Sequence, residues 1–125
     1  MDSNNIIIKQ QSGFRKKRQT RDNILFLTQK ALESINWGTK MCSIFFDIAS
    51  AFDKVWHEGL LFKLINLKLP NHLITWIKEF LTDRVFCVRV GNSISVKKNI
   101  GAGVLQGAVL SPTLFSIFIN DIPIK

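Results

Sequence analysis

The chain is poor in cysteine, and its two cysteines form no recognisable pattern. Cys42 and Cys87 are the only two among 125 residues. They do not belong to a CxxC motif, and no pair of histidines lies at the spacing of metal ligands. The sequence therefore supports neither a disulfide framework nor a zinc site, and we expect two reduced thiols with a structural role.

Long apolar stretches are also lacking. No run approaches the roughly 18 residues that a membrane-spanning helix needs. The polar start, Met1–Asn5, does not resemble a signal peptide. We therefore expect an intracellular protein, in the nucleus or the cytoplasm, that is not secreted and does not span a membrane.

Acidic residues are scarce. Nine Asp and Glu stand against 17 Lys and Arg, which gives a formal net charge of +8. This excess favours a polyanionic partner, either nucleic acid or an acidic membrane face, and charge alone does not choose between them. Hydrophobic residues make up 46% of the chain, enough for the modest core of one ordinary domain.

The first half of the chain predicts a helix followed by a buried strand. A basic cluster precedes the helix; it consists of Arg15, Lys16, Lys17, Arg18 and Arg21. Thr20 is the expected cap, and the helix should end between Asn36 and Gly38. Its predicted apolar face comprises Ile24, Leu27, Ala31 and Ile35. The short run Ser43–Ile48 is rich in bulky apolar residues and predicts a buried strand that carries one carboxylate, Asp47.

The second half predicts two amphipathic core helices, a hairpin and a last helix. The first helix presents Leu60, Leu61, Leu64, Ile65 and Leu67 at helical spacing. The second, begun by Pro70 and the possible cap Asn71, presents Leu73, Trp76, Ile77, Phe80 and Leu81. Alternating apolar residues on both sides of Gly91–Ser93 predict a hairpin. Ser111 and Pro112, as cap and first helical residue, should open a helix with the face Leu114, Phe115, Phe118, Ile119 and Ile122.

The segment Phe45–His57 reads FFDIASAFDKVWH. It resembles polymerase motif A of non-LTR (LINE-type, jockey-like) retrotransposon reverse transcriptases, a hydrophobic run and Asp followed by Ala-Phe-Asp-x-Val-x-His. The resemblance implies that Asp47 is a catalytic metal ligand and that Phe52 blocks the 2′-hydroxyl of ribonucleotides. It makes Asp53 a structural neighbour of the site. The alternatives are that Asp47 caps a turn and that Phe52 is a core aromatic.

The implied chemistry explains the carboxylate. In-line displacement at an α-phosphate uses two divalent ions, which stabilise the attacking and leaving oxygens. Mg²⁺ prefers hard carboxylate ligands, and the end of a rigid strand holds such a ligand well. The expected cofactor of the complete enzyme is therefore two Mg²⁺ ions, with Mn²⁺ as a substitute.

The segment Gly103–Ile122 begins with GVLQGAVLSPTLF. It resembles motif B of the same family, usually Gly-Val-Pro-Gln-Gly-Ser-x-Leu-Ser-Pro-x-Leu-Phe. The resemblance implies a nucleotide-binding loop, in which Gly107 lets the backbone approach the substrate and Gln106 offers amide hydrogen bonds. A plain turn before a capped helix is the alternative, but it leaves Gln106 unexplained. Leu105 and Ala108 depart from the usual Pro and Ser.

A third match is the segment Gln11–Thr20, which resembles the fingers motif Gln-x-Gly-Phe-Arg-x-x-x-Ser-Thr. It implies that Arg15 and Arg18 contact the template backbone or the triphosphate, since guanidinium groups fit phosphate oxygens. With Lys17 and Arg21 they form the expected nucleic-acid-binding set. A solvated basic face or a nuclear-import patch remains the alternative.

Together the matches imply an α/β (α+β) fold: a partial right-hand polymerase palm with part of the fingers, and an antiparallel sheet packed by helices. We expect one reverse transcriptase domain fragment over residues 1–125, with about 1–40 in the fingers and 41–125 in the palm. The implied function is RNA-directed DNA polymerisation, with an RNA template, a DNA primer and deoxynucleoside triphosphates. Group II intron and telomerase polymerases are rivals, and the run Ala51–His57 favours the retrotransposon branch.

The family's second aspartate motif, which follows motif B, is not found in this sequence. We do not expect Asn120–Asp121 to replace it, because an Asp at the end of the motif B helix should face solvent or cap a turn. The chain alone, without the downstream palm and thumb, is therefore expected to be inactive. The alternative function is a catalytically inactive nucleic-acid-binding remnant of such an element.

Overall fold

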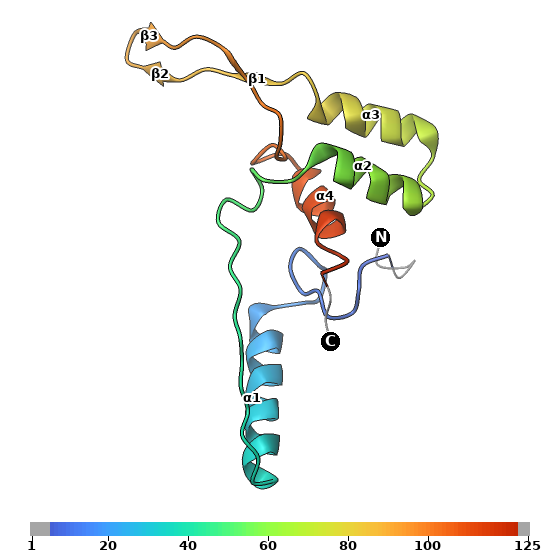
Figure 1. Cartoon of the computed structure of the whole chain (residues 1–125), viewed down its shortest axis with the longest axis vertical. Coiled ribbons are helices and arrows are strands. Elements are labelled where there is room, and N and C mark those ends of the chain that lie inside the picture. The colour runs from blue at the N-terminus through green and yellow to red at the C-terminus, as the bar shows by residue number, and fades with distance from the viewer. Residues whose placement is uncertain (1–5, 123–125) are drawn as a thin grey trace. The chain divides into compact units, whose positions relative to one another are not determined.

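The structure is a computed structural model that describes residues 6–122. The polar start, which we compared with a signal peptide, lies outside these residues. The chain divides into two compact units, Met1–Ala49 and Ser50–Lys125, which are described separately. Figure 1 labels the elements: α1 (Thr20–Asn36), α2 (His57–Asn66), α3 (Asn71–Leu81), β1 (Val85–Phe86), β2 (Arg89–Val90), β3 (Ser93–Ile94), β4 (Lys98–Asn99) and α4 (Ser111–Phe118).

Helix α1 of the first unit ends at Asn36, as predicted, but its cap differs from the prediction. Thr20 is the first helical residue and Gln19 is the cap. The backbone N–H of Gln19 donates to the Asp22 carboxylate at 2.8 Å, one half of a capping box. Asp22 also places a negative charge in the first turn, where it is favoured by the helix dipole.

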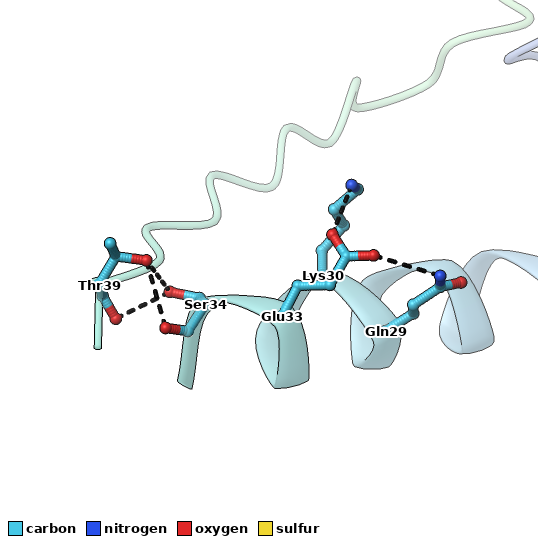
Figure 2. A network of polar contacts seen from close by, with 5 residues as sticks. All are labelled: Gln29, Lys30, Glu33, Ser34 and Thr39. Carbon is cyan, nitrogen blue, oxygen red and sulfur yellow. Dashed lines mark hydrogen bonds and ion pairs between the residues drawn. The ribbon is translucent and has the colours of Figure 1, made fainter. Parts of the chain in front are cut away.

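The C-terminal half of α1 carries a small polar network (Figure 2). The Ser34 hydroxyl donates to the Thr39 carbonyl oxygen at 2.8 Å, and the Thr39 hydroxyl donates to the Ser34 carbonyl oxygen at 3.2 Å. Glu33 receives hydrogen bonds from Lys30 at 2.7 Å and from Gln29 at 3.2 Å. The bond from Lys30 lowers the pKa of Glu33. The bond from Thr39 satisfies the Ser34 carbonyl group in the last turn of the helix, and the pair of bonds ties the chain after Asn36 to that turn.

The apolar face of α1 is not buried. No residue of the helix is buried, and Ile24 and Ile35 are 61% and 71% exposed. The helical spacing was therefore predicted correctly, while the packing of that face against a core is not found among residues 6–122.

The predicted strand over Ser43–Ile48 is wrong. The segment has no ladder partner among the described residues, and Ile44, Phe45 and Phe46 are 73%, 79% and 90% exposed. A strand forms only where a neighbouring strand satisfies its backbone N–H and C=O groups. Its composition suits a sheet, but no described segment pairs with it.

The second unit has a core built from three helices. Helix α2 contacts both α3 and α4. The side chains of the core share near-complete burial; they are Val55, Leu60, Leu64, Ile77, Leu81, Val104, Leu114 and Ile117. Full burial of each such side chain contributes about 1.5–3 kcal/mol. The two predicted core helices are confirmed, although Ile65 and Trp76 of the expected faces are 56% and 58% exposed.

Helix α4 begins one residue earlier than predicted. Leu110 is the cap residue, and Ser111 is the first helical residue, followed by Pro112. The Ser111 hydroxyl is buried without a hydrogen-bond partner among the described residues, so it does not cap the helix. The expectation of a serine cap is therefore wrong, and the proline at the start of the helix is confirmed.

The predicted hairpin is present as two short antiparallel ladders, β1 with β4 and β2 with β3. Val90 pairs with Ser93 across a turn in which Gly91 has a φ of +59°. In Figure 1 the hairpin projects away from the three helices of its unit. The structure is thus mixed α and β with small antiparallel sheets, which agrees with the coarse fold class.

Lys63 joins α2 to the end of α4. Its ammonium group donates to the Phe118 carbonyl oxygen, pairs with Asp121 at 2.5 Å, and lies 4.9 Å from the centre of the Phe118 ring. The hydrogen bond from Lys63 lowers the pKa of Asp121. Asp121 is nevertheless 71% exposed, so the expectation that it faces solvent is confirmed. No helix within residues 6–122 has the length and apolarity to cross a membrane.

Two glycines of the motif B loop adopt left-handed backbone angles, but their surroundings differ. Gly103 has a φ of +88° and Gly107 a φ of +86°. A Cβ atom on Gly103 would meet the Asp53 backbone at 2.7–2.9 Å, whereas a Cβ atom on Gly107 would meet nothing within 4 Å. Both positions favour glycine for their φ, but only Gly103 also lacks room for a side chain.

We predict that Gly103→Ala destabilises the chain much more than Gly107→Ala does. Gly107→Ala should lower the free energy of unfolding by roughly 1–2 kcal/mol, the cost of a left-handed non-glycine residue. Gly103→Ala should lower it by roughly 2–5 kcal/mol, because overpacking against backbone adds about 1–3 kcal/mol. Urea unfolding of both variants is the measurement. Equal losses would contradict the close approach of Gly103 to Asp53.

Candidate polymerase site

The end of motif A and the start of motif B meet in the second unit. We call residues 52–57 and 103–107 the A–B junction. The Val104 N–H donates to the Phe52 carbonyl oxygen at 2.9 Å, and the Gly103 N–H donates to the Val55 carbonyl oxygen at 2.8 Å. Val55 and Val104 are among the most buried side chains of the unit. Two motifs that are far apart in the sequence are therefore held together by backbone hydrogen bonds over buried valines.

Gln106 and Asp53 join the two motifs through their side chains. The Gln106 amide nitrogen donates to the Asp53 carboxylate at 3.1 Å. An ionised carboxylate only accepts hydrogen bonds, so the amide must turn its NH₂ group toward Asp53 and its carbonyl oxygen elsewhere. Asp53 thus orients the side chain predicted to act in the nucleotide pocket, in keeping with its expected role as a structural neighbour.

Phe52 is half-buried and stacks on Phe115 of α4. The ring centroids lie 4.6 Å apart with an angle of 18° between the rings. Stacked aromatic pairs of this kind contribute about 0.5–1.5 kcal/mol beyond their burial. The contact gives Phe52 a packing role and fixes the plane of its ring, and its predicted role against the 2′-hydroxyl stays a prediction.

Two residues of this site were not singled out from the sequence. The His57 ring nitrogen Nε2 lies 2.8 Å from the Gly103 carbonyl oxygen, and an Arg84 guanidinium nitrogen donates to the same oxygen. His57 is 8% exposed and Arg84 is half-buried. His57 stands within the motif A pattern, so its place there was a signal. Arg84, between α3 and the hairpin, carried no sequence signal, because its partner lies 19 residues away in a loop.

A pocket of about 610 Å³ opens beside the junction. Its lining combines charged and amide groups with apolar walls; it comprises Asp53, Arg84, Phe86, Ile100, Ala102, Gly103, Val104, Leu105 and Gln106. Apolar walls with a few polar groups are typical of pockets that bind small ligands. Gln106 therefore lines a pocket, Gly107 after it is exposed, and the nucleotide-binding role of both residues stays a prediction.

Asp47 belongs to the first unit, on the exposed segment that precedes Ala49. No group of three or more His, Cys, Asp or Glu side chains within residues 6–122 is placed to hold a metal ion. The predicted role of Asp47 as a metal ligand stays a prediction.

The arginines of the basic cluster have structural contacts. Arg15 donates to the carbonyl oxygens of Ile8 and Gln11 at 3.0 and 3.3 Å. Arg18 donates to the Lys9 carbonyl oxygen at 3.3 Å. The sequence did not reveal that these two guanidinium groups shape the loop before α1. The other two members of the expected binding set, Lys17 and Arg21, are exposed.

Comparison with known proteins places these motifs in one family. The family model described as reverse transcriptase (RNA-dependent DNA polymerase) matches residues 1–125. No solved structure matches the chain.

Three fly proteins illustrate the similarity. The chain is 38% identical over 123 residues to a probable RNA-directed DNA polymerase from transposon BS of Drosophila melanogaster. It is 42% and 44% identical to RNA-directed DNA polymerases from mobile element jockey of Drosophila melanogaster and Drosophila funebris, over 122 and 117 residues. These alignments cover 94–98% of the chain but only 13–14% of the relatives. The family model matches the whole length of the chain, and motifs A and B of that family are in contact in the structure. The chain therefore belongs to the reverse transcriptase family, among the polymerases of non-LTR retrotransposons.

Proposed function

We propose that this chain is the part of a retrotransposon RNA-directed DNA polymerase that binds the incoming nucleotide and supplies one catalytic carboxylate. The observation that carries the proposal is the A–B junction, where Gln106 is oriented by Asp53 beside a pocket. Phe52, at the edge of the same junction, is held in place by Phe115. The template, the primer and the deoxynucleoside triphosphate are the substrates implied by this role.

The division of the chain into about 1–40 of the fingers and 41–125 of the palm belongs to the same proposal. The basic cluster in the first part would track the phosphates of the template and primer. Lys17 and Arg21, which are exposed, suit sequence-independent contacts, because charges neutralise phosphates without reading base edges.

Reverse transcriptases generally use divalent metal ions, and Asp47 is the residue of this chain that suits one. A Mg²⁺ ion is bound by one or two carboxylates together with phosphate oxygens and waters. When bound, the ions stabilise the attacking and leaving oxygens of the displacement. In this proposal the carboxylate of Asp47 supplies one ligand of such an ion. The expectation that the chain alone does not polymerise rests on the second aspartate motif, which is not found in the sequence.

The first prediction from this proposal concerns Asp47. A chimera in which this chain replaces the matching 122 residues of the Drosophila melanogaster jockey polymerase should extend a DNA primer on an RNA template with Mg²⁺ or Mn²⁺. Asp47→Asn should lower its rate by on the order of a hundredfold or more, because metal-ion stabilisation contributes several kcal/mol and each 1.36 kcal/mol is about tenfold. The chain alone should give no extension.

Asp53→Asn is the matched control. It also removes one negative charge, but the amide that it introduces keeps an oxygen that accepts the hydrogen bond from Gln106, so the loss of rate should be small. Equal losses for the two variants would contradict the assignment of Asp47. A chimera that binds primer–template but never extends it would support the nucleic-acid-binding remnant instead.

The second prediction concerns sugar selectivity. In the same chimera, Phe52→Val should let ribonucleotides compete better by roughly tenfold or more, because the smaller side chain no longer meets the 2′-hydroxyl. Phe115→Val is the control, since it removes the same ring stacking without removing the predicted gate. Selectivity is measured as the ratio of kcat/KM for the two nucleotides. A lower melting temperature with unchanged selectivity would assign Phe52 to packing alone.

The third prediction concerns the basic cluster. Lys17→Ala with Arg21→Ala should weaken binding of an RNA–DNA primer–template to the chain and flatten its salt dependence by about one unit of log slope per lost phosphate contact. These two residues are chosen because Arg15 and Arg18 also hold the loop. Fluorescence anisotropy at several salt concentrations gives the slope. The control, Lys97→Ala with Lys98→Ala, removes the same charge from the hairpin. An equal loss of affinity in the control would mean that the net charge of the chain, and not the basic cluster, determines binding.

A further inference from the structure

We propose that His57 and Arg84 are positioning residues that together hold the Gly103 carbonyl group and thereby set the place of Gln106 in the nucleotide pocket. The inference rests on the proposed function and extends it to two residues for which no role was implied. We call this arrangement the Gly103 clamp.

The protonation of the clamp follows from its geometry. A carbonyl oxygen only accepts hydrogen bonds and a guanidinium only donates them. His57 Nε2 lies 2.8 Å from the Gly103 oxygen, so this ring nitrogen must carry a hydrogen. The distance of 3.2 Å between His57 Nε2 and the Arg84 nitrogen is therefore a contact between two donors that share one acceptor. The two lone pairs of the carbonyl oxygen are both used.

The clamp is fixed from both sides. His57 is the first residue of α2 and is buried. Arg84 also donates to the Leu81 carbonyl oxygen at the end of α3, at 3.0 Å, and its own carbonyl oxygen accepts from the Ile100 N–H at 2.8 Å. The Gly103 carbonyl group is thus connected through His57 to the helical core, and through Arg84 to the end of α3 and the base of the hairpin.

Gly103 in turn controls where the loop begins. Its N–H is held by Val55, its carbonyl oxygen by the clamp, and its α-carbon side faces the Asp53 backbone without room for a Cβ atom. Gln106 follows three residues later and is oriented by Asp53. A small movement of Gly103 therefore changes the angle at which Gln106 enters the pocket, and misplacement of a substrate-positioning group lowers activity steeply.

Both donors of the clamp are engaged by backbone carbonyl groups. The His57 nitrogen that faces the junction is occupied by the Gly103 oxygen, and two guanidinium nitrogens of Arg84 are occupied by the backbone carbonyl groups of Leu81 and Gly103. Arg84 also lines the pocket, so its positive charge is a second property that the test must separate from the clamp.

The decisive pair of variants is His57→Ala and His57→Gln. Alanine removes the donor, whereas the glutamine amide nitrogen reaches the place of Nε2 and restores it without a ring. In the jockey chimera, His57→Ala should raise the nucleotide KM between about tenfold and a hundredfold, with unchanged affinity for primer–template, and His57→Gln should recover most of this loss. The control is His72→Ala, an exposed histidine of α3, which should behave as the parent.

Arg84 is tested by coupling. Because both donors share one oxygen, the effects of His57→Ala and Arg84→Ala on the nucleotide KM should not multiply in the double variant. Independent effects that multiply would mean that Arg84 acts through its charge in the pocket, and would overturn the clamp.

Hydrogen exchange on the chain itself separates failure of the clamp from failure of the proposed function. His57→Ala should speed exchange of the amides of Gly103 and Val104, while His57→Gln keeps them near the parent rate and α3 is unchanged. An inactive parent chimera would count against the proposed function only. Unchanged exchange at Gly103 and Val104, or a lowered melting temperature with an unchanged nucleotide KM, would overturn the inference.

Discussion

The site depends on the close approach of two backbone segments, at Asp53 and at Gly103. Without a side chain on Gly103, the motif B loop comes near enough to motif A for the N–H groups of Gly103 and Val104 to reach carbonyl oxygens of Val55 and Phe52. These bonds close over buried valines, where an unpaired backbone group would be costly. The two segments can therefore form these hydrogen bonds only because Gly103 has no side chain to keep them apart.

Side chains take their orientation from this approach. Asp53 accepts the hydrogen bond of Gln106 because the two backbones lie side by side, and Phe52 meets Phe115 because α4 starts soon after the same loop. Each contact links a residue of motif A to one of motif B. Residues of the two motifs, which are distant in the sequence, are therefore in direct contact in the fold.

The features of the fold that depend on local sequence patterns were predicted correctly. The end of α1 at Asn36, the two core helices and the turn at Gly91 follow from helical spacing, proline and glycine, and all are found. The buried strand at Ser43–Ile48 was wrong, because a strand depends on a partner that composition does not specify. The clamp by His57 and Arg84 was missed for a similar reason: its acceptor is a backbone oxygen, and every residue has one. A side chain that binds a backbone group therefore cannot be paired with its partner from the sequence alone.

The two halves of the proposed chemistry therefore differ in how well they are held. Gln106 extends from a loop whose first residue is fixed at its N–H, its α-carbon and its carbonyl oxygen. Asp47 stands on a backbone that has no ladder partner among the described residues, beside phenylalanines that are 79% and 90% exposed. A metal ligand needs a position held within about 0.5 Å. In the proposed function, the contacts that place Gln106 therefore all lie within the second unit, whereas the segment that carries Asp47 leaves its phenylalanines exposed among the described residues.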